Sequence, residues 1–295
     1  MDVDVDIREV GPRDGLQAEP PLPVAARVRL IEALLDAGVR HMEICAFVSP
    51  RAVPAMADAA DVVAAVERRP GVRFVALVPN GKGAELALEA GITDLSFTVS
   101  ASPTYNEKNV GMTVNESVEQ LASIVACGPS SVDAVVSCAF GSPYEGDIEP
   151  GAVAALADRL LDVGATSLTY ADTTGMATPR RVDELLAETG PAVRLHLHET
   201  RGTALVNAYA ALLAGVRRFD TSIGGLGGSP FAAGAAGNLG TEDLVHLLDD
   251  LGHPTGIDLD VLLAASALAS ELVGHPVPSR VATAGPRSRR VAPEA

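Results

Sequence analysis

Two histidines separated by one residue, His196 and His198, offer the clearest means of binding a metal ion in this sequence. They lie in the segment Arg-Leu-His-Leu-His-Glu-Thr, whose apolar residues predict a short buried strand beginning near Val193. Side chains two apart in a strand share a face and lie about 7 Å apart along it, so both imidazoles can reach one ion. The structural alternative is that one histidine packs in the interior while the other hydrogen-bonds to a backbone carbonyl.

Further polar residues stand where other predicted strands end. They are Arg13 and Asp14 after the first strand, Glu43 at the end of the second, Asp172 at the end of the sixth, and Ser229 and Asn238 in the glycine-rich segment after the eighth. Only a closed barrel would bring so many strand ends to one mouth, which is where barrel enzymes carry their active sites. Taken alone, Arg13 beside Asp14 is equally compatible with a surface turn and a weak ion pair.

The chemistry of this set favours a hard divalent cation. Asp14, His196, His198 and the amide carbonyl of Asn238 combine oxygen and nitrogen ligands and leave room for two substrate oxygens. Such a site suits Mg²⁺ or Mn²⁺, with Zn²⁺ or Co²⁺ as alternatives. The ion would polarise a carbonyl and stabilise an enolate or alkoxide, and Arg13 would neutralise developing negative charge.

The elements that must position these residues follow an alternating β/α pattern. Eight apolar runs predict strands that begin near Val5, Val39, Val72, Thr93, Val132, Ser167, Val193 and Val216. Between and after them, helical patterns cover 24–37, 55–68, 81–90, 113–127, 149–163, 179–189, 202–214 and 240–252. Eight such units predict an α/β fold, the TIM (β/α)₈ barrel. A doubly wound sheet is the alternative, but it would leave two strands unexplained.

One domain is expected to span residues 1–274. An apolar pattern after Asp258 predicts an additional C-terminal helix reaching about Leu272 and covering part of the barrel. Residues 275–295 carry several prolines and an arginine cluster without periodicity, so a flexible tail is expected there.

Composition narrows the function classes. The chain has 295 residues, 47% of them hydrophobic, with no Trp and 3% aromatics, which suggests a barrel interior of branched aliphatic side chains. A net charge of −16 argues against nucleic acid as a partner. No apolar run is long enough for a membrane span, and the N-terminus lacks signal-peptide features, so a cytoplasmic protein is expected. Cys45, Cys127 and Cys138 lack metal-type spacing and are expected to be small structural hydrophobes.

Several segments together resemble one enzyme family. The run Glu-Val-Gly-Pro-Arg-Asp-Gly-Leu-Gln at 9–17 resembles the opening motif of 3-hydroxy-3-methylglutaryl-CoA lyase, a member of the DRE-TIM metallolyases. The similarity continues in order and spacing through 47–50, 56–58, 136–139, 143–146, 172–173, 225–228, 237–239 and 241–244. It therefore extends over nearly the whole chain, from about residue 5 to 274.

The resemblance implies roles for individual residues. It implies metal ligands at Asp14, His196, His198 and Asn238, enolate stabilisation by Arg13, reacting-centre roles for Glu43 and Asp172, and pocket positions for Gln17 and Thr169. The implied reaction is a retro-Claisen cleavage of an acyl-CoA: a 3-hydroxyl loses its proton, a carbon–carbon bond breaks, a keto acid leaves and the acetyl-CoA enolate is protonated. Members of the family are commonly dimers, which makes a homodimer compatible with this chain.

The sequence also departs from the family pattern. Ser229 stands where the family has a catalytic loop cysteine. A thiol with a pKa of about 8.5 exchanges a proton near neutrality, whereas an alcohol needs a neighbouring base. We therefore expect the same type of chemistry with a changed substrate or direction. Two alternatives remain: a condensing synthase that joins acetyl-CoA to a 2-oxo acid, and a non-catalytic acyl-CoA or metal-binding barrel.

Overall fold

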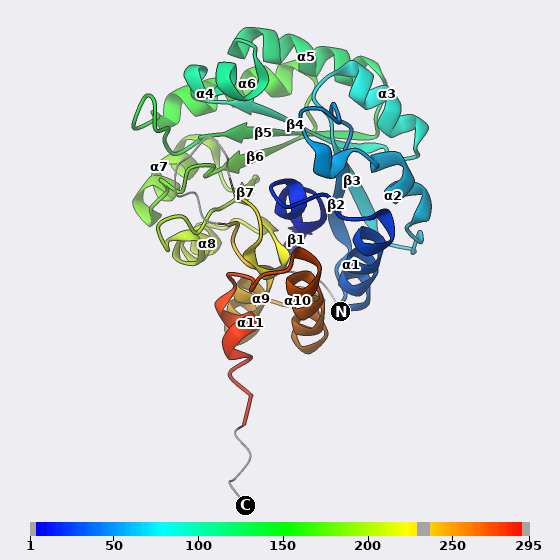
Figure 1. The fold of residues 1–295 in the computed structure, drawn as a ribbon. Coiled ribbons are helices and arrows are strands. Elements are labelled where there is room, and N and C mark those ends of the chain that lie inside the picture. The colour runs from blue at the N-terminus through cyan, green and yellow to red at the C-terminus, as the bar shows by residue number, and fades with distance from the viewer. Residues whose placement is uncertain (1–3, 229–236, 291–295) are drawn as a thin grey trace, which may run out of the picture.

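Eight parallel strands close into a barrel in the order in which they follow one another along the chain, and helices surround it (Figure 1). The computed structural model describes residues 4–228 and 237–290. Strand β8 pairs with β1, with Asp220 opposite Arg8, and this pairing completes the ring. The TIM-barrel prediction is confirmed, and the doubly wound alternative is excluded.

The strands begin within two residues of the predicted positions. They are β1 (Asp6–Glu9), β2 (His41–Ala46), β3 (Arg73–Leu77), β4 (Asp94–Ser100), β5 (Ser131–Ser137), β6 (Ser167–Ala171), β7 (Arg194–His196) and β8 (Arg218–Thr221). The predicted helices are α1 (Val24–Asp36), α2 (Ala59–Ala65), α3 (Gly81–Glu89), α5 (Val114–Ala126), α6 (Pro150–Val163), α7 (Pro179–Thr189), α8 (Ala204–Leu213), α9 (Thr241–Leu251) and the additional α10 (Leu259–Val273).

Elements that the apolar pattern did not predict are short. They are the π-helical turn η1 (Gly11–Gly15), the 3₁₀ turns η2 (Pro54–Met56) and η3 (Ile223–Gly225), and the helices α4 (Pro103–Val110) and α11 (Arg280–Ala284). The structure thus differs from the expected tail, because α11 lies within it beside α9 (Figure 1). The Val281 N–H donates to the Asp243 carboxylate, and the Ser279 N–H donates to the Gly224 carbonyl.

The apolar core lies between the strands and the helices. Leu30, Ile31 and Leu34 of α1 are fully buried because their spacing places them on one helix face, and Leu244 and Leu248 do the same on α9. Each such side chain stabilises the fold by roughly 1.5–3 kcal/mol through burial. None of the helices within 4–228 and 237–290 is long and apolar enough to cross a membrane.

The barrel axis differs from the expected aliphatic filling. Arg8 is 2% exposed and donates to the carboxylates of Asp133 and Asp220 at 2.8 Å each. Thr169 donates to Asp133 at 2.6 Å. The aliphatic interior predicted from composition is therefore wrong at this level of the barrel: the strands enclose a paired, hydrogen-bonded charge network, the arrangement that burial of charge requires.

Candidate active site

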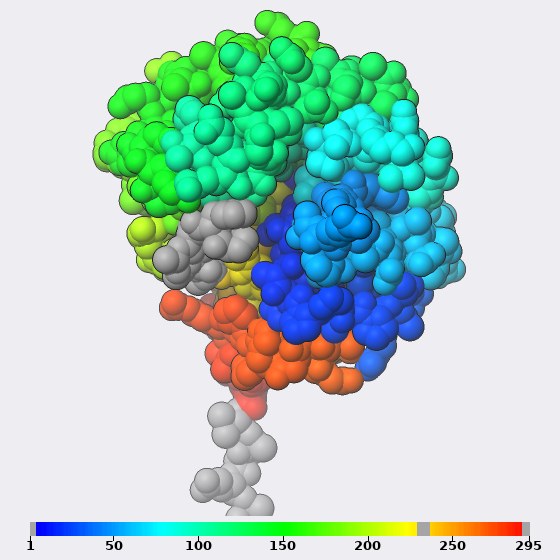
Figure 2. Space-filling view, turned by 45° about the horizontal axis from the view of Figure 1, so that its top comes forward, coloured from blue at the N-terminus to red at the C-terminus, as the bar shows by residue number. Residues whose placement is uncertain are grey.

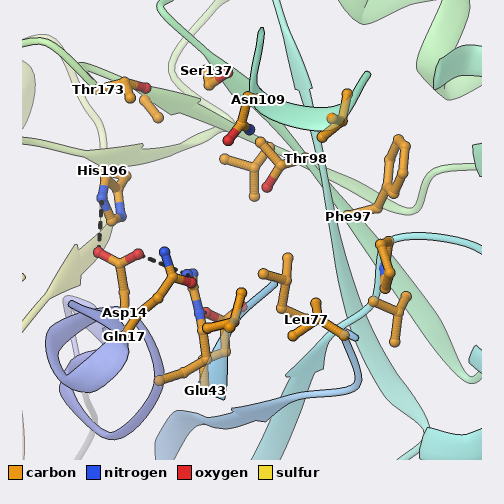
Figure 3. Close-up of a pocket in the computed structure, with 18 of the residues that line it drawn as sticks. Asp14, Gln17, Glu43, Leu77, Phe97, Thr98, Asn109, Ser137, Thr173 and His196 are labelled. Carbon is orange, nitrogen blue, oxygen red and sulfur yellow. Dashed lines mark hydrogen bonds and ion pairs between the residues drawn. The ribbon is translucent and has the colours of Figure 1, made fainter. Parts of the chain in front are cut away.

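A cavity of about 610 Å³ opens at the carboxyl ends of the strands. In the space-filling view it is the recess between the blue N-terminal residues and the cyan and green residues that follow (Figure 2). Figure 3 shows its two halves: Asp14, Gln17 and Glu43 lie together with His196, and Leu77 and Phe97 lie on the opposite side. The unpredicted helix α4 also contributes to the lining. A polar end joined to an apolar one suits a ligand with a charged head and a long organic tail.

The turn η1 brings Arg13 and Asp14 into this cavity. The carbonyl of Val10 accepts hydrogen bonds from the backbone N–H groups of Arg13, Asp14 and Gly15, at 3.1, 2.7 and 3.2 Å. The buried carboxylate of Glu9 accepts a further bond from the Gly11 N–H at 2.7 Å. Hydrogen bonds to Glu9 and to the Val10 carbonyl thus hold the backbone of the turn in place both before and after Pro12.

Arg13 is held among three acceptors. Its Nη1 donates to Asp14 Oδ1 at 2.7 Å and lies 3.5 Å from Gln17 Oε1. Its Nε donates to Glu43, whose other oxygen accepts from the Ser96 hydroxyl. Glu43 was predicted to end its strand but lies within β2, where the register shifts between Glu43 and Cys45. Glu43, beside this irregularity, lines the cavity. β-Bulges are common next to active sites, where they change the direction in which a side chain points.

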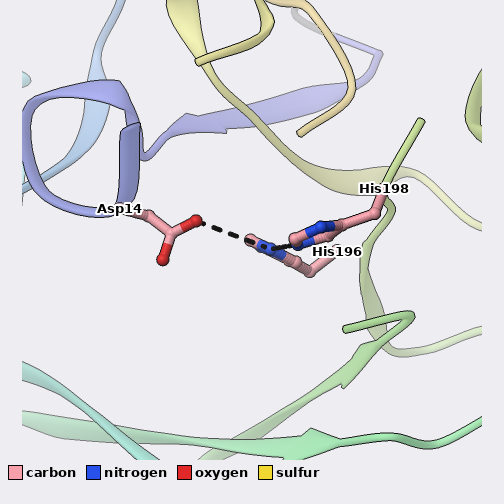
Figure 4. Close-up of side chains that lie close together, drawn as sticks. All are labelled: Asp14, His196 and His198. Atoms are coloured by element: carbon pink, nitrogen blue, oxygen red, sulfur yellow. Dashed lines mark hydrogen bonds and ion pairs between the residues drawn. The ribbon is translucent and has the colours of Figure 1, made fainter. Parts of the chain in front are cut away.

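Three potential metal ligands converge beside Arg13 (Figure 4). Ligand atoms of Asp14, His196 and His198 all lie within 4.8 Å of one another. The two Nε2 atoms of the histidines are 3.1 Å apart, and Asp14 Oδ2 is 4.0 Å from His196 Nε2. Both histidines therefore face the same point from β7 and the residues after it, as the spacing predicted.

Asn238 completes the group. Its Nδ2 donates to Asp14 Oδ2 at 2.7 Å and to the Leu226 carbonyl at 3.0 Å, and its Oδ1 is buried without a hydrogen-bond partner. An unsatisfied amide oxygen beside a carboxylate and two imidazoles is a donor set that fits a divalent cation. Gly227 allows this approach: its φ is +104°, and a Cβ there would lie 2.5 Å from Asn238 Nδ2.

The electrostatics act in opposite directions on Asp14 and His196. Burial would raise the pKa of Asp14, but the charge of Arg13 and the hydrogen bond from Asn238 hold it below its ordinary value. Burial would lower the pKa of His196, but its hydrogen bond to Asp220 and the charge of that carboxylate raise it. Asp14 is consequently an anion at neutral pH, ready to bind a cation.

Some predicted site residues lie elsewhere. Thr169 is fully buried and bonded to Asp133 rather than facing the cavity, so the structure does not place it at the substrate pocket. Asp172 lies between the lining residues Ala171 and Thr173, but its Oδ1 accepts from the backbone N–H groups of residues 176 and 177. Burial raises the pKa of Asp172 to about 7. Ser229 lies outside the described residues.

Sequence reasoning missed the residues behind the histidines. Asp220 of β8 contacts His196 Nδ1 at 3.2 Å, and Arg8 of β1 contacts Asp220. Both line the cavity, and Arg8 also lines a smaller cavity of about 230 Å³ at the opposite mouth of the barrel. The available signal was a charged residue in the middle of a short strand, because such a residue must be paired when it is buried.

Comparison with known proteins gives consistent matches over nearly the whole chain. The HMGL-like family model matches residues 4–269. The 3-hydroxy-3-isohexenylglutaryl-CoA/hydroxymethylglutaryl-CoA lyase of Pseudomonas aeruginosa is 40% identical, covering 95% of this chain and 96% of its own. The (R)-citramalyl-CoA lyase of Chloroflexus aurantiacus is 44% identical, covering 96% and 95%. An HMG-CoA lyase of Acinetobacter baumannii, solved with coenzyme A and 3-methylmalate, superposes with a TM-score of 0.93 at 41% identity, covering 98% and 97%.

Proposed function

The chain belongs to the HMGL-like family and is a carbon–carbon lyase, and from this premise we propose that its substrate is 3-hydroxy-3-methylglutaryl-CoA or a close analogue. The products are acetyl-CoA and a keto acid. The observation that carries the proposal is the group Asp14, His196, His198 and Asn238 beside Arg13, at the polar end of a cavity whose other end is apolar.

The residues at the polar end of the cavity have three roles in this proposal: metal binding, stabilisation of negative charge and orientation of the substrate. Asp14, His196, His198 and Asn238 would hold Mg²⁺ or Mn²⁺, which supplies Lewis-acid polarisation of substrate oxygens when bound. Arg13, fixed by Glu43, presents a positive charge to the enolate that forms at the thioester. Gln17 lines the same wall and orients the substrate.

The reaction needs no oxidant or second substrate. The 3-hydroxyl gives up its proton, the bond between C2 and C3 breaks, and its electron pair forms the acetyl-CoA enolate, which then takes up one proton. A role of Asp172 in exchanging these protons stays a prediction, because its Oδ1 accepts from the backbone N–H groups of residues 176 and 177 and Asp172 itself does not line the cavity. The role of Ser229 in returning the proton stays a prediction.

A second substrate is favoured by a separate observation. The (R)-citramalyl-CoA lyase is 44% identical to this chain, against 40% for the 3-hydroxy-3-isohexenylglutaryl-CoA/hydroxymethylglutaryl-CoA lyase of Pseudomonas aeruginosa, at nearly the same coverage. A citramalyl thioester carries the same 3-hydroxyl and carboxylate on a shorter acid. The same residues could therefore act on it, and kcat/KM for the two thioesters decides which is preferred.

The experiment measures acetyl-CoA release from both thioesters by the purified protein with Mg²⁺ or Mn²⁺. Activity should disappear with EDTA and in His198→Ala. His246→Ala is the matched control, because His246 lies on α9 and does not line the cavity. No release from either thioester would contradict the proposal. Free CoA appearing from acetyl-CoA and a 2-oxo acid would show instead that the protein works as a condensing synthase.

We also propose a homodimer. Val206, Tyr209 and Leu213 on α8 are exposed, and their spacing places them along one face of that helix. Burial against a second copy would remove this apolar surface from water. Light scattering should give twice the chain mass of 30.2 kDa, and Leu213→Glu should lower it to that of a single chain. A wild-type protein with the mass of one chain would contradict the proposal.

A further inference from the structure

Asp220 contacts the side of the His196 ring that faces away from the metal group. Its Oδ2 lies 3.2 Å from His196 Nδ1. The other ring nitrogen, Nε2, faces His198 at 3.1 Å and Asp14 at 4.0 Å. The two residues are also register partners in the pairing of β7 with β8. The carboxylate and the metal group therefore occupy opposite ends of one imidazole.

Arg8 fixes the carboxylate of Asp220 in place. Its Nε donates to Asp220 Oδ1 and its Nη2 to Oδ2, both at 2.8 Å, in a two-bond fork. Asp220 is 3% exposed, and Arg8 is 2% exposed. The remaining guanidinium nitrogen of Arg8 donates to Asp133 at 2.8 Å. Both Asp220 oxygens are thus occupied, and the carboxylate cannot turn without breaking a buried ion pair.

We propose that Asp220, immobilised by Arg8, is a positioning residue that holds His196 with its proton on Nδ1 and the lone pair of Nε2 directed at the metal group. The inference rests on the proposed function, because it assumes that the group binds a cation. A carboxylate bonded to the rear nitrogen fixes both the tautomer and the ring orientation of a metal-binding histidine. Arg8, on β1, holds the Asp220 carboxylate, on β8, so the chain of contacts that orients His196 reaches from β7 across β8 to β1.

The variant Asp220→Asn tests the arrangement with little change of size. Arg8 presents an N–H to each oxygen of Asp220, so the amide nitrogen of asparagine would face a donor in either orientation. Placed beside His196, that nitrogen would favour a lone pair on Nδ1 and a proton on Nε2. The dissociation constant for Mn²⁺, measured by electron paramagnetic resonance of the free ion, should rise by about 10–100-fold.

The matched control is Asp133→Asn. Asp133 is the other carboxylate bound to Arg8, and it is bonded to Thr169 and Ser167 rather than to His196. This variant weakens the same buried charge network, but it should leave Mn²⁺ affinity unchanged. If both variants lose affinity equally, a general loosening of the barrel explains the result and the inference is overturned.

A second measurement needs no substitution. Nitrogen-15 NMR of the metal-free wild-type protein, recorded at a pH high enough for the His196 ring to be neutral, reports which ring nitrogen of His196 carries its single proton. Protonation of Nδ1 supports the inference, and a neutral ring protonated on Nε2 overturns it even if Asp220→Asn does not fold. A folded Asp220→Asn that binds Mn²⁺ as tightly as the wild type also overturns it. A wild-type protein that binds no Mn²⁺ would instead refute the proposed metal dependence, so the two failures are distinguishable.

Discussion

Glu9 should make the stability of this protein fall as the pH rises, and Glu9→Gln should remove that dependence. Its Oε1 accepts from the N–H groups of Gly11 and Ile223 at 2.7 and 2.8 Å, and its Oε2 accepts from the Thr241 hydroxyl at 2.6 Å. The side chain is fully buried, and this burial raises its pKa from 4.5 to about 8. Three hydrogen bonds do not offset the loss of water around a charged carboxylate.

The direction of the effect follows from proton binding. Between pH 4.5 and about 8 the folded protein keeps a proton on Glu9 that the unfolded chain has released. The stabilising contribution is complete below pH 4.5 and is lost as the pH rises to about 8. Because each pKa unit corresponds to about 1.4 kcal/mol, the lost contribution is on the order of 5 kcal/mol.

Glutamine fits the same site without a charge. Its carbonyl can accept from Gly11 and Ile223, and its amide group can donate to Thr241, whose hydroxyl lies 2.8 Å from that of Thr221 and can donate there. No buried group loses its partner, so Glu9→Gln should be more stable than the wild type at pH 9. Near pH 5 the two proteins should be close in stability.

Urea denaturation followed by circular dichroism at several pH values from 5 to 9 measures the free energy of unfolding of both proteins. The wild-type curve should fall more steeply than that of the variant, and the difference should reach a few kcal/mol. Glu89→Gln, at an exposed position on α3, is the matched control and should leave the wild-type slope unchanged. Parallel curves for Glu9→Gln and wild type would refute the reasoning.

Three further predictions concern the site and the thiols. Mn²⁺ at about 100 times its dissociation constant should stabilise the protein by about 2.7 kcal/mol, seen as a rise in Tm that is absent in His198→Ala; an equal rise in that variant would place the ion elsewhere. Arg13→Lys should lower kcat by roughly 100-fold or more while Mn²⁺ affinity is kept, since lysine cannot reproduce the simultaneous contacts of Arg13 with Glu43 and Asp14, and near-normal kcat would count against its role. Burial raises the pKa of both Cys45 and Cys138 to about 12, so a thiol reagent should find only Cys127 in the native protein and all three after denaturation, whereas rapid modification of two would contradict that burial.

The repeating units of this fold were predictable because burial dictates them. Apolar runs and helix-end glycines located all eight strands within two residues. The pattern missed α4 because its exposed residues Asn109, Glu107 and Lys108 give it little apolar periodicity, and a serine cap starts it instead. Local capping is a weaker signal than a hydrophobic stripe, yet α4 lines part of the cavity.

The directly converging side chains were predictable, and those behind them were not. His196 and His198 share a face by spacing alone, and their position at a strand end suggested the mouth of the barrel. Asp220 gave no comparable signal, because its partner Arg8 is 212 residues away and only barrel closure brings them together. Thr169 illustrates another limit: a hydroxyl in a strand can face the cavity or a buried carboxylate, and in this structure it donates to Asp133.

The hydrogen bond between Asn238 and Asp14 joins residues 224 positions apart, from the last and the first β/α units. A nascent chain therefore cannot assemble the complete ligand group until about four-fifths of the chain has been synthesised and the last strand has paired with the first. Partial barrels emerging from a ribosome would have histidines and an aspartate, but they would lack the geometry to capture an ion. Metal binding by this protein would accordingly follow the completion of folding and would not initiate it.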